Sequence, residues 1–151
     1  MMKSRLLGVR RMNNYILEGE YLEIVMELLG EHYNVRSLIK LVFMSFCIKN
    51  GKRSSYGGRK KDFVEVFFSS LNVKLLSHSD ELAAIFEVIY KMKSSGWIEI
   101  DDDNIYVLKE LKNFKCENKF LVGCRDKDIN PIREVNKLDS RAFVEEVLRH
   151  V

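Results

Sequence analysis

The segment that most constrains the fold of this chain is residues 80–108, DELAAIFEVIYKMKSSGWIEIDDDNIYVL. Its first part has apolar residues at the spacing of an amphipathic helix, and the pattern stops at Gly96, a residue type that commonly ends helices. Two short runs, Trp97–Ile100 and Ile105–Leu108, then alternate between the two sides of a strand. The polar residues between them are typical of a turn, because Asp and Asn tolerate left-handed backbone. The segment predicts a helix that leads directly into an antiparallel hairpin.

Three segments before this one also have helical patterns. Glu20–Gly30 ends in a glycine, Val35–Lys49 is apolar on almost every side, and Asp62–Leu71 has one apolar face. Because a helix that is apolar all round must be buried all round, we expect Val35–Lys49 to be the central core helix, capped by Asn34 or Ser37. The first of the three is expected to bury Tyr21, Leu22, Val25, Leu28 and Leu29. The predicted fold is mainly α with a small antiparallel β-hairpin.

The sequence indicates the secondary structure of the two ends of the chain less clearly. Residues 1–19 are interpreted as a basic N-terminal arm or short strand, residues 20–108 as the main domain, and residues 109–151 as a C-terminal helical extension. In the extension, we expect a weak helix over Lys109–Lys119, irregular chain over Leu121–Pro131, and a last helix over Arg141–His150, capped by Asp139 or Ser140. That last helix either packs on the main domain or binds a partner, and the pattern does not choose between them.

Charge is unevenly distributed. The net charge is only +3, yet residues 1–12 carry four basic residues and residues 49–61 carry six, with no acid in either segment. The remainder of the chain is therefore acidic overall. The second basic segment contains three glycines and is predicted to be a loop. It is the candidate contact for nucleic acid or an acidic partner, and the alternative is a solvated loop that balances an acidic body. Its candidate contact residues are Lys49, Lys52, Arg53, Tyr56, Arg59, Lys60 and Lys61.

The helix and hairpin of residues 80–108 lack the groups that read DNA. With Leu82, Ile85, Phe86 and Ile89 in the core, the opposite face is expected to hold Asp80, Ala84, Glu87, Val88, Lys91 and Ser94. No Arg, Asn or Gln lies there to bond base edges, and three aspartates in the turn would repel phosphates. The hairpin is therefore predicted to meet protein, with Trp97, Asp101, Asp102 and Asp103 as interface residues. For Trp97 the alternative is that it closes the core over the end of the helix.

No sequence motif indicates catalysis, a cofactor or a metal. The pattern GxxxxGK[ST] is absent, the three histidines are far apart, and the acidic turn lacks the glycine and distal Glu of a calcium loop. Cys47, Cys116 and Cys124 have no metal-ligand spacing and are expected to be reduced thiols. No apolar run is long enough to span a bilayer and no signal-peptide core is present, so we expect a cytoplasmic protein. Because no catalytic motif is found, we also expect that the protein is not an enzyme. A polar pocket with converging ionisable side chains would favour an enzyme.

The order helix, helix, basic loop, helix, helix, hairpin over residues 20–108 resembles a winged helix-turn-helix domain. Three stretches, SLIKLVFMSFCIKN, GRKKDFVEVF and SSGWIEIDDDNIYVL, also resemble the small middle component of bacterial ABC-three-component (Lamassu-like) antiphage defence systems. In those systems a small winged-helix-like protein accompanies an SMC-like ATPase and an effector. The resemblance is one of general character, so it assigns no functional residue.

Two functions follow as expectations. The first is a non-catalytic accessory or adaptor subunit of a multiprotein complex, which the resemblance implies to be an antiphage assembly with an SMC-like ATPase and an effector. The alternative is a free-standing winged-helix DNA-binding transcriptional regulator, in which the basic loop and N-terminus supply the affinity.

Overall fold

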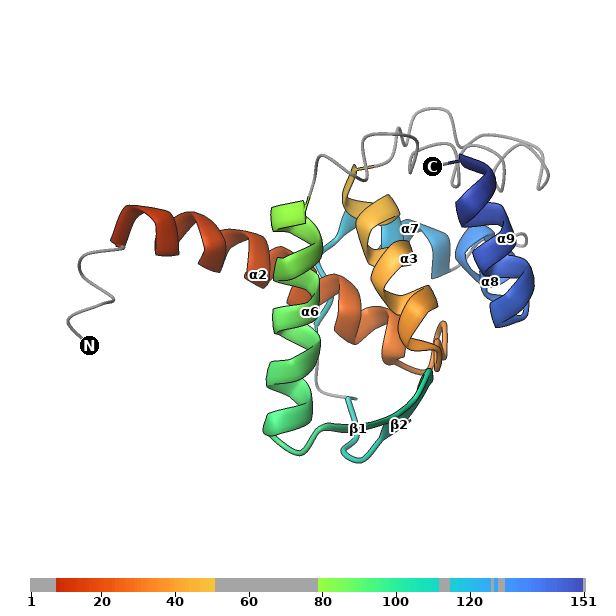
Figure 1. Cartoon of the computed structure of the whole chain (residues 1–151), viewed down its shortest axis with the longest axis horizontal. Coiled ribbons are helices and arrows are strands. Elements are labelled where there is room, and N and C mark those ends of the chain that lie inside the picture. The colour runs from red at the N-terminus through yellow and green to blue at the C-terminus, as the bar shows by residue number, and fades with distance from the viewer. Residues whose placement is uncertain (1–7, 51–78, 112–114, 126, 128–129, 151) are drawn as a thin grey trace.

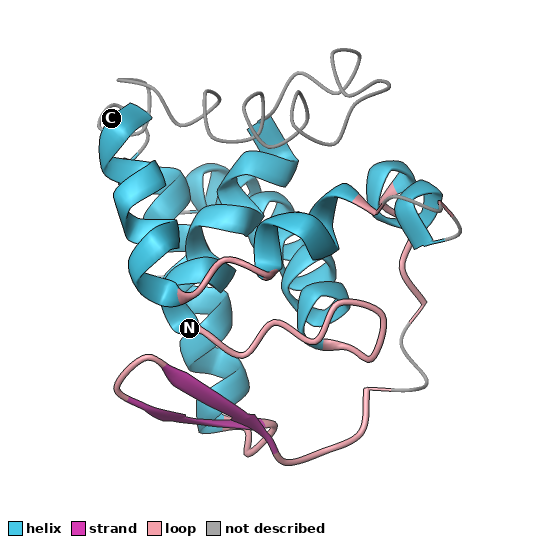
Figure 2. Ribbon diagram, turned by 90° about the vertical axis from the view of Figure 1, so that its right-hand side faces the viewer, coloured by secondary structure: helices cyan, strands magenta, loops and turns pink. Residues whose placement is uncertain are grey.

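A computed structural model describes residues 8–50, 79–111, 115–125, 127 and 130–150. It confirms a mainly helical chain with one two-stranded antiparallel hairpin (Figures 1 and 2). The predicted basic loop from residue 51 onward and the predicted helix Asp62–Leu71 lie outside the described residues. The described elements are α2 (Gly8–Leu29), α3 (Leu38–Asn50), α6 (Ser79–Ser94), β1 (Ile98–Asp101), β2 (Asn104–Val107), α7 (Lys119–Arg125), α8 (Pro131–Asn136) and α9 (Ser140–His150).

Helices α2, α3 and α6 pack against one another and form the centre of the core (Figure 1). The prediction of a buried central helix is confirmed, since α3 is buried from Leu41 to Ile48 except for the half-buried Phe43. Ser37 caps this helix: its Oγ accepts a hydrogen bond from the amide of Lys40 at 3.3 Å. None of the described helices is both long and apolar enough to cross a membrane.

Helix α2 begins earlier than the sequence predicts. It starts at Gly8, so residues 8–19 are helical and do not form the short strand that was one alternative. Gly19 lies inside the helix and does not break it, because a single glycine only weakens a helix. Figure 1 shows the first turns of α2 extending beyond the packed body. At its other end α2 stops at Leu29, and the amide of Gly30 donates to the carbonyl of Met26 at 3.0 Å.

Gly96 ends α6 as predicted. Its φ is +78°, a left-handed conformation that glycine adopts without a steric penalty. The amide of Gly96 donates to the carbonyl of Lys93 at 3.1 Å, and the amide of Trp97 donates to that of Met92 at 3.0 Å. These two bonds form a Schellman motif, which satisfies carbonyls at the end of the helix. The motif fixes the direction in which the chain enters the hairpin.

The hairpin has the predicted composition, with a shorter turn. Asp101 pairs with Asn104, so both belong to the strands and only Asp102 and Asp103 form the turn. Asp102 has φ +52°, the left-handed backbone expected in this turn. Before α3, Ser37 forms an isolated antiparallel bridge with Asn104. The hairpin thus joins the helical body through the segment that leads into α3 (Figure 2).

The C-terminal part of the chain differs most from expectation. Residues 109–111 and 115–118 are not helical, and the region predicted to be irregular contains α7 and the start of α8. Asn130 caps α8, since its side chain accepts hydrogen bonds from the amides of Ile132 and Arg133. The last helix is confirmed, with the Asp139 carboxylate as acceptor for the amide of Ala142 at 2.7 Å.

The C-terminal helices pack on the body of the protein. Side chains from all three are buried in the same core as α2, α3 and α6, among them Leu121, Ile132 and Phe143. The Tyr33 hydroxyl donates to the carbonyl of Leu121 at 2.8 Å, and the Lys40 ammonium donates to that of Asn136 at 3.0 Å. Of the two alternatives left by the sequence for the last helix, packing on the body is the one observed.

Candidate protein-binding groove

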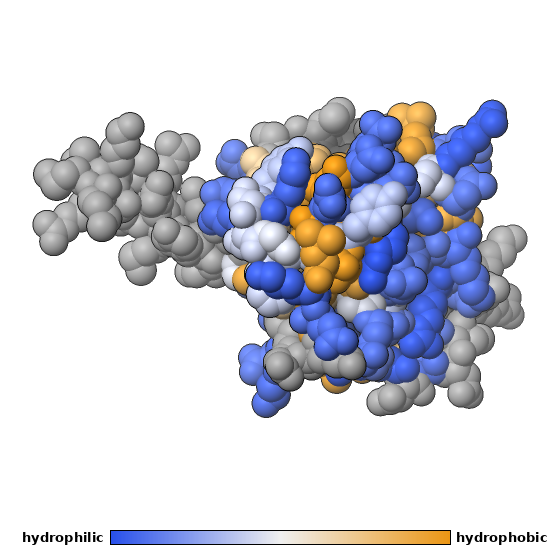
Figure 3. All heavy atoms as spheres, turned by 90° about the horizontal axis from the view of Figure 1, so that it is seen from below, coloured by the Kyte–Doolittle hydropathy of each residue, from blue (hydrophilic) through white to orange (hydrophobic). Residues whose placement is uncertain are grey.

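An apolar groove of about 420 Å³ lies between α2 and α6, at the start of the hairpin. Helix α2 contributes Gly19, Leu22 and Met26 to its lining, and α6 contributes Val88, Lys91 and Met92 among others. Trp97 completes the wall. The volume falls within the roughly 300–1,000 Å³ range of ligand-binding pockets. Figure 3 shows apolar side chains gathered in the middle of the face seen from below, with hydrophilic residues around them.

Trp97 is held in the wall of the groove by backbone bonds on both sides. Its amide is the last donor of the Schellman motif, and its carbonyl accepts from the amide of Leu108 at 2.8 Å. The side chain is partly buried and packs against the core, while Lys109 Nζ lies 5.6 Å from the ring centroid. At this distance the cation and the ring attract each other. Trp97 therefore closes the core and also lines the groove, so the two interpretations made from the sequence do not exclude each other.

The sequence reasoning missed Leu22 and the outer face of the hairpin. Leu22 was expected in the core, yet it is 40% exposed at the groove. On the hairpin, Tyr106 is 52% exposed, and Leu108, which bonds to Trp97, is 57% exposed. The alternation of the strands could have indicated these two, because Tyr106 and Leu108 alternate with the inward-facing Ile105 and Val107.

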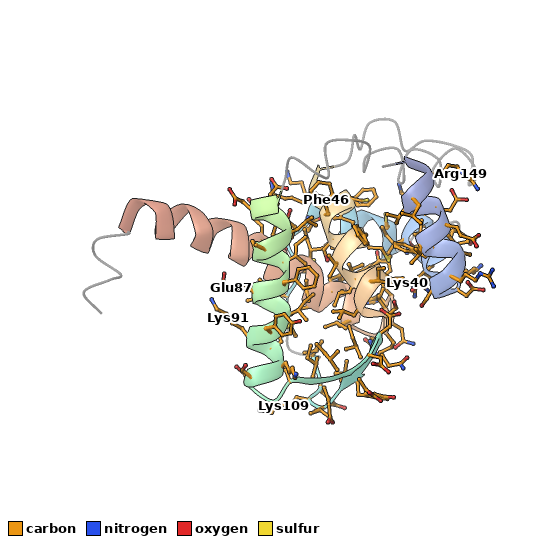
Figure 4. The ribbon with its side chains drawn as sticks, in the orientation of Figure 1. Lys40, Phe46, Glu87, Lys91, Lys109 and Arg149 are labelled. Carbon is orange, nitrogen blue, oxygen red and sulfur yellow. The ribbon has the colours of Figure 1, made fainter. Side chains whose placement is uncertain are left out.

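The face of α6 that was predicted to be exposed is partly buried. Ala84 and Val88 are buried, whereas Phe86, which was placed in the core, is 37% exposed. Phe86 stacks on the exposed Tyr90 with ring centroids 6.3 Å apart. The prediction was wrong because α2 and α3 contact α6 from two sides, which turns its buried stripe toward Ala84 and Val88. Figure 4 shows Glu87 and Lys91 on the outer side of α6, where they form an exposed ion pair of 3.5 Å.

The three aspartates of the hairpin do not share one role. Asp101 and Asp102 are exposed, as a partner-binding turn requires. Asp103 instead bonds inside the protein: its carboxylate accepts from Ser37 Oγ at 2.6 Å, from the Ile39 amide at 2.8 Å and from Ser140 Oγ at 3.0 Å. That Asp103 meets a partner stays a prediction, and within the protein its oxygens join the hairpin to the starts of α3 and α9.

Of the basic loop only Lys49 is among the described residues. Its Nζ lies 3.0 Å from a carboxylate oxygen of Glu20 on α2, so this lysine already has an acidic partner within the protein. The other candidate contacts, Lys52, Arg53, Tyr56, Arg59, Lys60 and Lys61, lie outside the described residues, and their role stays a prediction.

A second, polar pocket of about 410 Å³ surrounds the C-terminal end of α2. Its ionisable lining residues are Glu27, Glu31, His32, Arg36, Glu110 and Arg125. Two of them form a partly buried ion pair, with Arg125 Nη2 and Nε both 2.6 Å from Glu27 Oε2. Arg36 Nη1 donates to the carbonyls of Leu29 and Val35 at 2.6 and 2.9 Å, which stabilises the end of the α2 dipole. Burial lowers the pKa of this guanidinium.

The three cysteines are buried, and none of them forms a disulfide with another. Burial raises the pKa of Cys116 to about 11 and also raises that of Cys124, so both thiols stay protonated near neutral pH. Within the described ranges, no group of His, Cys, Asp and Glu side chains is arranged to hold a metal ion.

Comparison with protein-family models, curated proteins and solved structures found no match for this chain.

Proposed function

We propose that this chain is a non-catalytic accessory subunit that binds other proteins through a winged-helix-like body. The winged-helix assignment is supported by the packing of α2, α3 and α6 and by the hairpin that follows α6 directly. It is also supported by the bridge between Ser37 and Asn104, since winged helices pair the segment before the second helix with the last strand of the wing.

The observation that carries the protein-binding role is the apolar surface around Trp97. This ring lines the groove, and next to it on the hairpin lies Leu108, whose amide bonds to the Trp97 carbonyl and which is more than half exposed. Apolar surface that is continuous and surrounded by polar residues is typical of protein interfaces. Trp and Tyr are also the residues most enriched at the energetic centres of such interfaces. The exposed Asp101 and Asp102 in the turn disfavour a DNA phosphate backbone as the partner.

For the identity of the assembly, the resemblance found in the sequence supplies the proposal. We propose an antiphage complex in which the chain holds an effector to an SMC-like ATPase. In that arrangement the groove and hairpin contact one of the two proteins, and the basic loop contacts nucleic acid or an acidic surface.

Co-expression tests this proposal. The full chain is produced together with the products of the genes adjacent to its own, and the mixture is separated by size-exclusion chromatography. We expect co-elution, and we expect the double variant Tyr106→Ser, Leu108→Ser to reduce it, while Lys119→Ser, an exposed position on α7 that belongs to neither the groove nor the hairpin, leaves it unchanged. A stable monomer that co-elutes with none of the neighbours would falsify the proposal.

A DNA-binding regulator is distinguished by fluorescence anisotropy with a labelled duplex at about 50 mM salt. Lysines and arginines of the basic loop at positions 52, 53, 59, 60 and 61 are changed to alanine for comparison. A regulator should bind the duplex, and each phosphate contact removed should lower the log–log salt slope by about 0.9. Absence of binding by the isolated wild-type chain would eliminate the regulator.

The polar pocket favours a second candidate function, the binding or turnover of a small polar molecule. A polar pocket with converging ionisable side chains favours an enzyme. This candidate requires a nucleotide, amino acid or sugar phosphate that raises the thermal midpoint of the wild-type chain and raises it less in Glu31→Gln. A panel of such ligands with no effect on the midpoint would eliminate it.

A further inference from the structure

Gly19 forms one end of the apolar groove with bare backbone. It lies in the interior of α2, where a glycine weakens the helix relative to alanine. A Cβ at this position would meet nothing within 4 Å, so no contact inside the chain requires glycine there. By contrast, Gly96 has a left-handed backbone, and a Cβ at Gly30 would lie 3.3 Å from two carbonyl oxygens. The absence of a side chain at position 19 leaves the groove open beside α2.

The floor and walls of the groove are apolar, and two lysines lie beside it. Val88 and Met92 are almost completely buried beneath the groove, and the more exposed Leu22 and Trp97 line it from α2 and from the start of the hairpin. Lys91 is the ionisable residue of the lining, and Lys109 Nζ lies over the Trp97 ring. The acid facing these lysines from α6 is Glu87, which is paired with Lys91, and Glu110 follows Lys109 in the chain. Figure 4 shows Lys91 and Lys109 at the outer side of α6 and at the hairpin.

We propose that the groove binds one amphipathic helix of a partner protein, with acidic residues beside its apolar stripe. This inference rests on the proposed protein-binding function and names the partner's chemistry. A helix places apolar side chains at i, i+3 or i+4, and i+7, which suits an apolar groove between two helices. Glycine on one helix allows the backbone of another to approach closely, which gives Gly19 a role. Carboxylates beside the stripe would pair with Lys91 and Lys109.

A second copy of this chain fits the groove less well. In a symmetric dimer each copy uses the same surface, so a groove-to-groove contact brings Lys91 and Lys109 of both copies toward the shared axis. Like charges placed together in an interface oppose association. Nucleic acid fits less well too, because the groove offers an apolar floor and two lysines where a phosphate backbone needs many donors.

The experiment uses the full chain and a defined probe. The probe is a yeast-displayed library of helices about 18 residues long that contain no tryptophan, long enough for each to be helical. Enriched sequences are synthesised with Glu, Gln or Lys beside the apolar stripe and titrated into the protein. Trp97 is the single tryptophan of the chain, so its emission reports directly on the groove. Peptide anisotropy gives the affinity independently.

Two glycine variants separate binding from folding. Gly19→Gln places a bulky neutral side chain at the groove, and Gly123→Gln is its matched control on α7, where a Cβ likewise meets nothing within 4 Å. Both should fold with an unchanged or raised thermal midpoint, because glutamine favours helix over glycine. We expect Gly19→Gln to lower the affinity for the enriched peptides at least tenfold and to abolish the shift in Trp97 emission. Gly123→Gln should bind these peptides like the wild type.

Enriched helices should carry the apolar spacing with acidic flanks, and exchanging Glu for Lys should weaken binding at least tenfold. A library that yields no such helix, flanks that are basic, or binding unaffected by Gly19→Gln would each overturn the proposal. Self-association in sedimentation that Gly19→Gln abolishes would overturn it in favour of a second copy. If Gly19→Gln still co-elutes with the neighbouring gene products, the groove is not the binding site for a partner helix, but the accessory function stands. If peptides bind the groove but the chain co-elutes with none of the neighbouring gene products, the helix-binding groove stands and the accessory function is contradicted.

Discussion

Two polar side chains near α3 have opposite consequences for stability. Ser45 is completely buried on α3, and among the described residues its hydroxyl has no hydrogen-bond partner. The Asp103 carboxylate has three hydrogen-bond partners on two other segments, and all three are far away in sequence. A buried donor without a partner loses its bonds to water and gains nothing, whereas a carboxylate with several donors is held strongly. Polarity alone therefore does not tell which side chain stabilises the fold.

Ser45→Ala should stabilise the protein. The substitution removes a buried hydroxyl that has no partner and places a better helix former in α3, so we expect a gain of about 0.5–2 kcal/mol in the free energy of unfolding. Urea denaturation measures it. Ser37→Ala is the matched control, because that hydroxyl caps α3 and donates to Asp103, and its loss should destabilise by about 1–2 kcal/mol. A destabilising Ser45→Ala would mean that this hydroxyl has a bond in solution.

Asp103→Asn should destabilise the protein by about 1–3 kcal/mol, because bonds to a charged acceptor are stronger than those to a neutral amide. The lost charge also lies near the start of α3, where a negative group is favourable, and near the buried Lys40. Asp102→Asn is the control in the same turn, and it should be close to neutral since asparagine tolerates the positive φ found there. Equal effects of the two substitutions in thermal unfolding would contradict the structural role of Asp103.

At the scale of elements, strongly periodic apolar patterns predicted which segments are helices, but they did not predict which face of α6 is buried. Helices α3, α6 and α9 and the hairpin were predicted because each has a long apolar pattern or a definite stop, such as Gly96. Helices α7 and α8 were missed, since they have seven and six residues, too few to show a period. In α6 apolar residues cover more than half of the circumference, so only packing by α2 and α3 decides that Val88 is buried and Phe86 exposed. Of the candidate site, Trp97 could be named from the sequence, but Leu22 could not.

Gly96→Ala tests the end of α6. A Cβ at position 96 would meet nothing within 4 Å, so the cost comes from the left-handed backbone alone. We expect a loss of about 1–2 kcal/mol in unfolding free energy. Gly19→Ala removes glycine from ordinary helical backbone and should instead stabilise by about 1 kcal/mol. If both substitutions shift the thermal midpoint in the same direction, the Schellman motif does not hold in solution.

At the scale of the whole molecule, the C-terminal helices are part of the same core as the helices that precede the hairpin. Leu121, Ile132 and Phe143 are buried there, and the pair formed by Glu27 and Arg125 joins α2 to α7. Burial also raises the pKa of Tyr33, whose hydroxyl bonds to α7, to about 12. These contacts connect segments on both sides of residue 108, which the sequence suggested as a boundary.

Truncation after residue 108 should therefore destabilise the remaining chain strongly. It removes the partner of Glu27, whose side chain is only 6% exposed, and leaving a buried charge without its partner costs about 3–5 kcal/mol. Circular dichroism of chain 1–108 should show no cooperative thermal transition, whereas the full chain should unfold in one. A truncated chain that melts cooperatively at the midpoint of the full chain would restore residues 20–108 as an independent domain.

The bonds of Asp103 also have a consequence for the kinetics of folding. The hairpin and the end of α6 are local in sequence, but Asp103 reaches Ser37 across 66 positions and Ser140 across 37. Contacts over such separations cost more loop-closure entropy than the contacts within the hairpin. The hairpin is thus expected to form early, and the attachment of α3 and α9 to its turn is expected to come late. A mainly helical chain of this size should for that reason fold more slowly than an up-and-down bundle, whose contacts are nearly all local.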